Sequence, residues 1–222
     1  MNFYKINKGH TIILFFLALI FLSTKILNLN YEIPFLPIIC FFLISTIGIT
    51  HGALDNSKGN KILKLYKIKQ NYFFYLVYII LAILVIFIWS IFSLFTLCIF
   101  LIVASYHFGK EDSNFEVAKK SKFMGILYLF KGSAVVWTPL IFHSDETLKI
   151  FEILNVSLIS IDINFLIFFL FISFISNFFI NDDILVSVAD WLTILMLNVT
   201  FVPLIAFTIY FCFLHSVRHS IS

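Results

Sequence analysis

Apolar stretches long enough to cross a lipid bilayer recur along this chain from Thr11 to its C-terminal end, with only brief polar breaks between them. A membrane-spanning helix needs about 20 mostly apolar residues. Hydrophobic residues make up 61% of the 222 residues and charged residues only 12%, a balance that a soluble domain with a polar shell does not carry. We therefore predict an all-α, polytopic membrane helix bundle that forms a single integral-membrane domain over residues 1–222.

Polar breaks and prolines divide the chain into eight predicted spans. They cover residues 11–28, 34–53, 71–89, 93–109, 121–143, 163–181, 183–198 and 203–220. The last two come from one run of 36 residues, Ile184 to His219. We divide this run between Asn198 and Pro203, because a proline inside a helix removes a backbone hydrogen bond and clashes with the preceding turn. If the run is undivided, the bundle has seven spans.

The distribution of basic residues predicts the orientation of the bundle, because lysine and arginine concentrate in cytoplasmic loops. With the N-terminus in the cytoplasm, twelve of the fifteen basic residues fall on the cytoplasmic side, while Asp145, Glu146 and Asp162 fall outside. We therefore predict a multi-pass protein of the cell membrane. The lysines lack the interleaved aromatic residues of a nucleic-acid groove, so we expect the lipid bilayer as a partner and no nucleic acid.

Four histidines are predicted to meet at the cytoplasmic face. The second and fourth spans end there with His51 and His107, and the eighth span carries His215 and His219 at the same end. Residues four apart lie on one side of a helix, so His215 and His219 can bind one metal ion, and the other two can complete the site from facing helices. His10, in the N-terminal tail, and His143, on the outer face, are not expected to be ligands.

Charged residues close to these histidines are predicted to support the metal site. Asp55 follows His51 by four residues, and Glu111 and Asp112 follow His107 by four and five, within reach of the imidazole nitrogen that does not bind metal. Arg218 is either a cytoplasmic anchor at a helix end or a two-point clamp on Asp55 or Asp112. Lys131 lies inside the fifth span, where we expect it to neutralise one of these carboxylates.

The identity of the metal stays open on ligand chemistry alone, since four neutral imidazoles fit iron, copper or zinc. A zinc hydrolase would need a general base near an aqueous cleft. The predicted site instead has aromatic neighbours that suit an apolar substrate arriving from the membrane, with dioxygen as co-substrate. These neighbours are Tyr106, Phe108, Trp137, Tyr210, Phe211 and Phe213.

Four motifs together resemble the Brp/Blh family, the membrane-bound bacterial and archaeal β-carotene 15,15′-dioxygenases. The motifs are His51-Gly-Ala-Leu-Asp55, Ser105-Tyr-His-Phe-Gly109 with Glu111-Asp112, Lys131-Gly132 with Pro139 and Phe142-His143, and Tyr210-Phe-Cys-Phe-Leu-His-Ser-Val-Arg-His219. The resemblance implies Fe(II) held by His51, His107, His215 and His219, with β-carotene and O2 as substrates and two molecules of all-trans-retinal as products. It also implies a C-terminally truncated chain, because family members continue well past the last motif.

Other classes of membrane protein remain as alternatives. A di-iron desaturase needs about twice as many histidines, and a bis-histidine haem protein would place its ligands near mid-helix rather than at helix ends. The main alternative is a non-catalytic carotenoid- or retinal-binding membrane protein, or a rhodopsin assembly factor, that uses the histidines structurally. Stoichiometric iron would favour the enzyme over this alternative. The sequence leaves the oligomeric state and the preferred carotenoid open.

Overall fold

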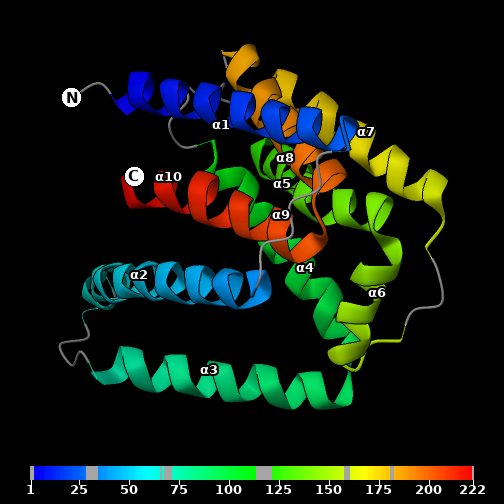
Figure 1. Cartoon of the computed structure of the whole chain (residues 1–222). Coiled ribbons are helices and arrows are strands. Elements are labelled where there is room, and N and C mark those ends of the chain that lie inside the picture. The colour runs from blue at the N-terminus through cyan, green and yellow to red at the C-terminus, as the bar shows by residue number, and fades with distance from the viewer. Residues whose placement is uncertain are drawn as a thin grey trace.

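The computed structural model describes residues 3–28, 35–65, 67, 72–113, 122–157, 161–180 and 183–221, with the side chains at 3, 48–58, 62, 220 and 221 excepted. All regular structure in these ranges is helical, which confirms the predicted fold class. The helices are α1 (Phe3–Ile26), α2 (Leu36–Leu65), α3 (Tyr72–Ile91), α4 (Ser93–Glu111), α5 (Met124–Phe142), α6 (Ser144–Ile153), α7 (Ile163–Ile180), α8 (Ile184–Thr200), α9 (Pro203–Ile209), the π-helix η1 (Tyr210–His215) and α10 (Ser216–Ile221), as Figure 1 shows.

Five helices in the described ranges are long and apolar enough to cross a membrane: Tyr4–Ile26 within α1, and α3, α4, α5 and α7. Two shorter apolar segments, Leu36–Ile47 and α8, add to them. The chain is therefore a polytopic helical protein of the kind that spans membranes, while the count of eight spans stays a prediction. The predicted break in the last run is observed, since α8 ends at Thr200 and Pro203 opens α9. Proline suits this first position because the first helical N–H has no partner within the helix.

Two helix boundaries differ from the predictions. Helix α2 continues to Leu65, well past the predicted end at residue 53, and so carries Lys58, Lys61 and Lys64. Helix α6 occupies part of the predicted outer loop, and Asp145 and Glu146 lie in its first turn, where acidic side chains favour the helix dipole. Both differences have one cause, because hydropathy marks where a helix can enter or leave a membrane and not where its backbone hydrogen bonding stops.

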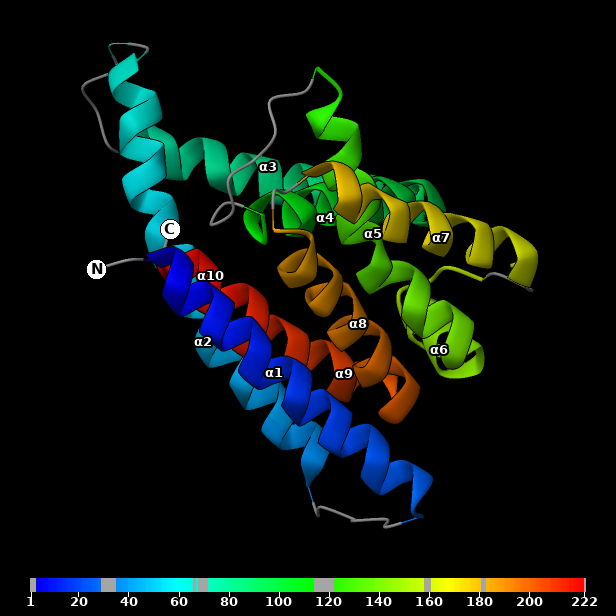
Figure 2. The same cartoon turned by 90° about the horizontal axis from the view of Figure 1, so that it is seen from above.

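Helices α4 and α5 cross in direct backbone contact at two glycines (Figure 2). A Cβ atom on Gly109 would lie 1.8 Å from the carbonyl oxygen of Tyr128, and one on Gly132 would lie 2.0 Å from that of Ser105. No side chain fits at either position, so the small residues permit this approach. The crossing fixes the C-terminal end of α4, where His107 and Asp112 lie.

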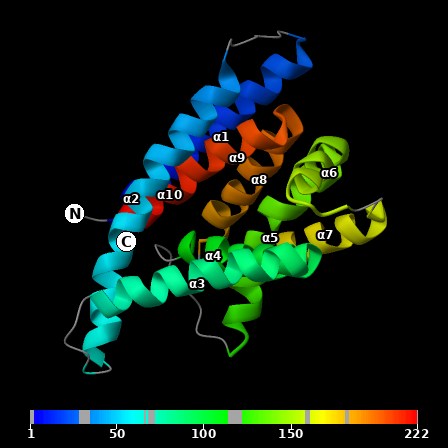
Figure 3. The same cartoon turned by 90° about the horizontal axis from the view of Figure 1, so that it is seen from below.

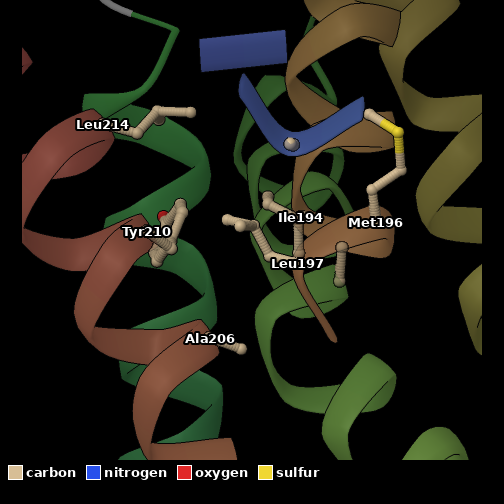
Figure 4. Packing of buried hydrophobic residues seen from close by; sticks show 8 residues of the cluster. Ile194, Met196, Leu197, Ala206, Tyr210 and Leu214 are labelled. Carbon is tan, nitrogen blue, oxygen red and sulfur yellow. The ribbon is translucent and has the colours of Figure 1, made fainter. Parts of the chain in front are cut away.

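The segment α9–η1–α10 lies beside α1, α2 and α8 (Figures 2 and 3). Its buried face carries Ala206, Tyr210 and Leu214, which point toward Ile194 and Leu197 of α8 (Figure 4). Apolar burial at this seam stabilises the fold by roughly 25 cal/mol per Å² removed from water, or less where lipid is the alternative. The core therefore holds the helix that carries His215 and His219.

Candidate metal centre

Three of the four predicted metal ligands lie together in the structure. The ring centroids of His107 and His215 are 5.2 Å apart, those of His107 and His219 are 6.3 Å apart, and those of His215 and His219 are 6.5 Å apart. Two imidazoles that bind one metal at about 2.0–2.1 Å have ring centroids roughly 5 to 6 Å apart. The His107–His215 pair has this separation, and His219 lies slightly farther from both, so α4, η1 and α10 bring the three rings together without bringing all of them to coordination distance.

The fourth predicted ligand, His51, and the predicted supporting residue Asp55 have side chains outside the described ones. The backbone of α2 runs through both positions, and α2 packs against α9, η1 and α10. Among the side chains that the structure describes, no three from histidine, cysteine, aspartate and glutamate already stand in positions that could hold a metal ion. Three of the four predicted ligands thus lie close together, but they do not form a complete coordination shell.

Asp112 and Glu111 contact the histidines of the last helix. The Nδ1 atom of His215 lies 2.9 Å from a carboxylate oxygen of Asp112, and the Nδ1 atom of His219 lies 3.3 Å from one of Glu111. A carboxylate on one imidazole nitrogen fixes the tautomer and leaves Nε2 for a metal. The spacing had predicted His107 of the same helix as their partner, so the pairing differs from the sequence interpretation. The carboxylates reach across to η1 and α10 instead of back along α4.

A buried hydrogen-bond network holds Asp112 in its charged form. The Tyr210 hydroxyl donates to its second carboxylate oxygen at 2.7 Å. Burial by itself would raise the pKa of Asp112, but the contacts with His215, Arg218 and Tyr210 outweigh it and lower the pKa below the ordinary value. The carboxylate therefore remains an acceptor for both neighbours.

The π-helix η1 brings Tyr210 and His215 to the same carboxylate. In a π-helix residues five apart are joined by backbone hydrogen bonds, and such segments occur often at functional sites. The two rings lie 6.1 Å apart, and each contacts a different oxygen of Asp112. The sequence did not predict the π-helical geometry of η1, because its six residues also fit an ordinary α-helix.

Arg218 has a partner that was not predicted, Asp190, while one of the two predicted partners, Asp55, has its side chain outside the described ones. It is 1% exposed, which excludes a solvated anchor, and its guanidinium donates two hydrogen bonds of 2.8 Å to the carboxylate of Asp190. It also donates to Asn7 at 2.8 Å and Thr11 at 2.6 Å of α1. With Asp112 its contact is the backbone carbonyl at 3.3 Å and not the predicted carboxylate. An acidic residue inside the apolar run of α8 was the signal that could have identified Asp190.

Lys131 and the remaining histidines also contact groups that were not predicted. The buried ammonium of Lys131 donates to the Ser113 hydroxyl at 3.1 Å, rather than to the carboxylate that the sequence suggested. His143 contacts the carbonyl of Asn198 at 2.9 Å. His10 lies within α1 and not in a tail. Lys131 and His143 thus contribute to helix packing rather than to the candidate ligand set.

The aromatic residues predicted near the site separate into two groups. The rings of Phe108, Tyr210 and Phe211 lie within 6.1 Å of the His215 ring. Trp137 packs instead against Phe165 and Phe169, in an apolar cavity of about 360 Å³ between α4, α5 and α7. The histidine cluster therefore has an aromatic border formed by α4 and η1.

The family model for Beta-carotene 15,15'-dioxygenase matches residues 42–222, a range that contains all four predicted ligands. The chain belongs to this family. This membership confirms the resemblance that the four motifs indicated.

A relative with this family's name, Beta-carotene 15,15'-dioxygenase of an uncultured marine bacterium 66A03, is 32% identical over 190 residues. The match covers 80% of this chain and 66% of the relative, so the chain spans just under two thirds of the relative's length. No solved structure matches the chain.

Proposed function

We propose that this chain cleaves β-carotene at its central 15,15′ double bond with O2 and releases two molecules of all-trans-retinal. The observation that carries the proposal is the convergence of His107, His215 and His219. Asp112 contacts Nδ1 of His215, and Glu111 contacts Nδ1 of His219. A chain of this family with that arrangement has the groups that an oxidative cleavage site needs.

The three imidazoles fit an iron ion. Neutral imidazole nitrogen is a good ligand for Fe(II), and the carboxylates of Asp112 and Glu111 direct Nδ1 of their histidines away from the shared centre. His51 would be the fourth ligand, from α2. When bound, iron would supply the activation of O2 that a polyene alone cannot provide.

In the proposed reaction the C15=C15′ bond breaks and each carbon gains one oxygen atom of O2, so that two aldehydes form without an external reductant. The chain's own residues bind, orient and exclude water. Phe108 stands edge-on to the His215 ring at 4.8 Å and shields it, while Asp112 keeps that ring in one orientation. The buried Tyr210 hydroxyl holds Asp112 in turn.

The site is proposed to lie at the cytoplasmic face of the cell membrane, with the N-terminus on the same side. The lysine distribution supports this orientation. In intact cells, a membrane-impermeant thiol reagent should label a Lys149→Cys variant, on the predicted outer side, and leave Lys67→Cys unlabelled, with the wild-type chain as the background. The reverse pattern contradicts the orientation.

Expression in bacteria that accumulate β-carotene tests the function. We expect retinal in extracts of cells with the wild-type chain, none with His215→Ala, and an unchanged amount with His143→Ala, a histidine outside the cluster. Iron should copurify with the wild type and be reduced in His215→Ala. Full-length protein that contains no iron and leaves β-carotene intact would contradict the proposal and favour a non-catalytic carotenoid binder.

A further inference from the structure

Four aromatic rings form a continuous stack along α9, η1 and α10 and end in the histidine cluster. The stack contains Phe207, Phe211, His215 and His219, each four residues after the last. Adjacent centroids are 5.5, 5.9 and 6.5 Å apart, and the planes of neighbouring rings differ by 13°, 24° and 20°. We call this row the aromatic ladder. Because the rings stack on one another, they form a continuous aromatic row that leads to the two histidines.

Phe207 and Phe211 pack at the edge of the core cluster and are the less buried half of the ladder. Ala206, Tyr210 and Leu214 are at most 2% exposed and pack toward α8 (Figure 4), whereas Phe207 and Phe211 are only half-buried. Leu204, one turn before Phe207, is 40% exposed and extends the apolar row away from the histidines. The row from Leu204 to His215 covers twelve residues, or eleven steps along the helix, which is about 16 Å at about 1.5 Å per step.

The surrounding helices make the ladder part of the same enclosure as the candidate metal centre. Helix α2 packs along α9, η1 and α10, and α3 packs against both α2 and α4 (Figure 3). From α4, Phe108 stands edge-on to His215 and reaches Phe207, with a centroid distance of 6.4 Å. The ladder thus forms one wall beside the cluster, with α4 opposite and α2 at its side.

A conjugated polyene is the ligand that this wall fits. Such a chain is apolar and several turns of helix long, and its π-face attracts the edges of aromatic rings such as those along the ladder. No charged side chain interrupts the row between Leu204 and His215. A shorter or more polar ligand would leave this face unused.

We propose that Phe207 and Phe211 bind one arm of the polyene, so that the bond at the inner end of that arm reaches the histidines. The identity of the polyene as β-carotene rests on the proposed function. The ladder is then a positioning element for the substrate, and the rings of the two phenylalanines act through contact with the polyene and not through the metal.

Equilibrium binding without oxygen tests this proposal separately from cleavage. β-carotene is titrated into the purified full chain in lipid nanodiscs under nitrogen, and binding is followed by quenching of tryptophan fluorescence. We expect Phe207→Leu and Phe211→Leu each to weaken binding about three- to tenfold, the loss expected for one aromatic contact. Phe207→Trp should bind within twofold of wild type, because it keeps an aromatic ring. The matched control is Phe171→Leu on α7, where the side chain is 58% exposed.

Wild-type affinity for β-carotene in both leucine variants, or an equal loss of affinity in Phe171→Leu, would contradict the proposed role of the ladder. So would a wild-type chain that does not bind β-carotene. The helix content of each variant is measured first. If Phe211→Leu fails to fold, the comparison of Phe207→Leu with Phe207→Trp tests the proposal. A chain that binds through the ladder but makes no retinal would overturn only the proposed function, so the two failures are distinguishable.

Discussion

Arg218 and Asp190 form a two-point ion pair between the last helix and α8, with both N···O distances at 2.8 Å. Both residues are at least 97% buried, and Thr11 of α1 joins them by accepting from Arg218 and donating to Asp190 at 3.1 Å. Three helices that are distant in sequence are thereby tied together directly behind His215 and His219. A buried pair of this kind is costly to break, because the remaining charge loses its compensation.

Removal of one partner should destabilise the protein strongly. We expect Asp190→Asn to lower the free energy of unfolding by about 3–5 kcal/mol, since it leaves the guanidinium of Arg218 without a buried counter-charge. Denaturation of the purified protein in detergent, followed by circular dichroism, measures the change. Asp145→Asn on the exposed first turn of α6 is the control. Equal stability of the two variants would show that the pair contributes little.

Asp112 should control metal affinity through His215. Asp112→Ala removes the acceptor of both His215 and Tyr210, so we expect iron to bind about 10- to 100-fold more weakly and retinal formation to fall with it. Iron content at a series of free-iron concentrations provides the measurement. Glu152→Ala, at an exposed position of α6, should bind iron like the wild type. Unchanged affinity in Asp112→Ala would exclude the carboxylate from the metal site.

The glycine crossing of α4 and α5 predicts a contrast between two glycine substitutions. Gly109→Ala places a methyl group against the backbone of Tyr128, so we expect a loss of about 1–3 kcal/mol of stability. Gly9→Ala meets no atom within 4 Å and should be neutral or stabilising by up to about 1 kcal/mol, because alanine favours helices. Thermal unfolding of both variants tests the contrast, and equal melting temperatures would contradict it.

Acid should weaken the contact between α1 and the start of α8. The Lys8 ammonium, at 2.8 Å, and the Tyr4 hydroxyl hydrogen-bond to the Asp183 carboxylate and lower its pKa. A depressed folded-state pKa contributes stability that is present above the unfolded value of about 3.9 and is lost as the pH falls through the folded value. The stability difference between wild type and Asp183→Asn should therefore shrink as the pH is lowered from 6 toward about 3. A constant difference would argue against this linkage.

Much of the helix order followed from hydropathy, because membrane helices must be apolar over their whole length. Pro203 marked the break after α8 for a local reason, since proline disfavours a helix interior. The extension of α2 had no such marker, because lysines are compatible with helix outside a membrane. Local rules therefore predicted where helices occur better than where they stop.

Which residues contact one another in the site was harder to predict than which residues belong to it. Spacing along α4 suggested that Glu111 and Asp112 serve His107, but the structure pairs them with His219 and His215. The choice depends on how η1 and α10 lie against α4, and no local pattern encodes it. The pair of Arg218 and Asp190 has the same origin, because its members meet only after α8 and α10 have packed.

The π-helix η1 sets the direction in which the last two histidines point. Its turn is wider than an α-helical turn, so Tyr210 through His215 contain one residue more than an α-helix would need to connect α9 with α10. If the same six residues formed a regular α-helix, His215 and His219 would turn by about 100° relative to the face that Ala206 anchors in the core. Deletion of one residue within η1 would cancel that turn, so a one-codon deletion is expected to keep a continuous helix and the direction of both histidines, and to remove only the wide turn.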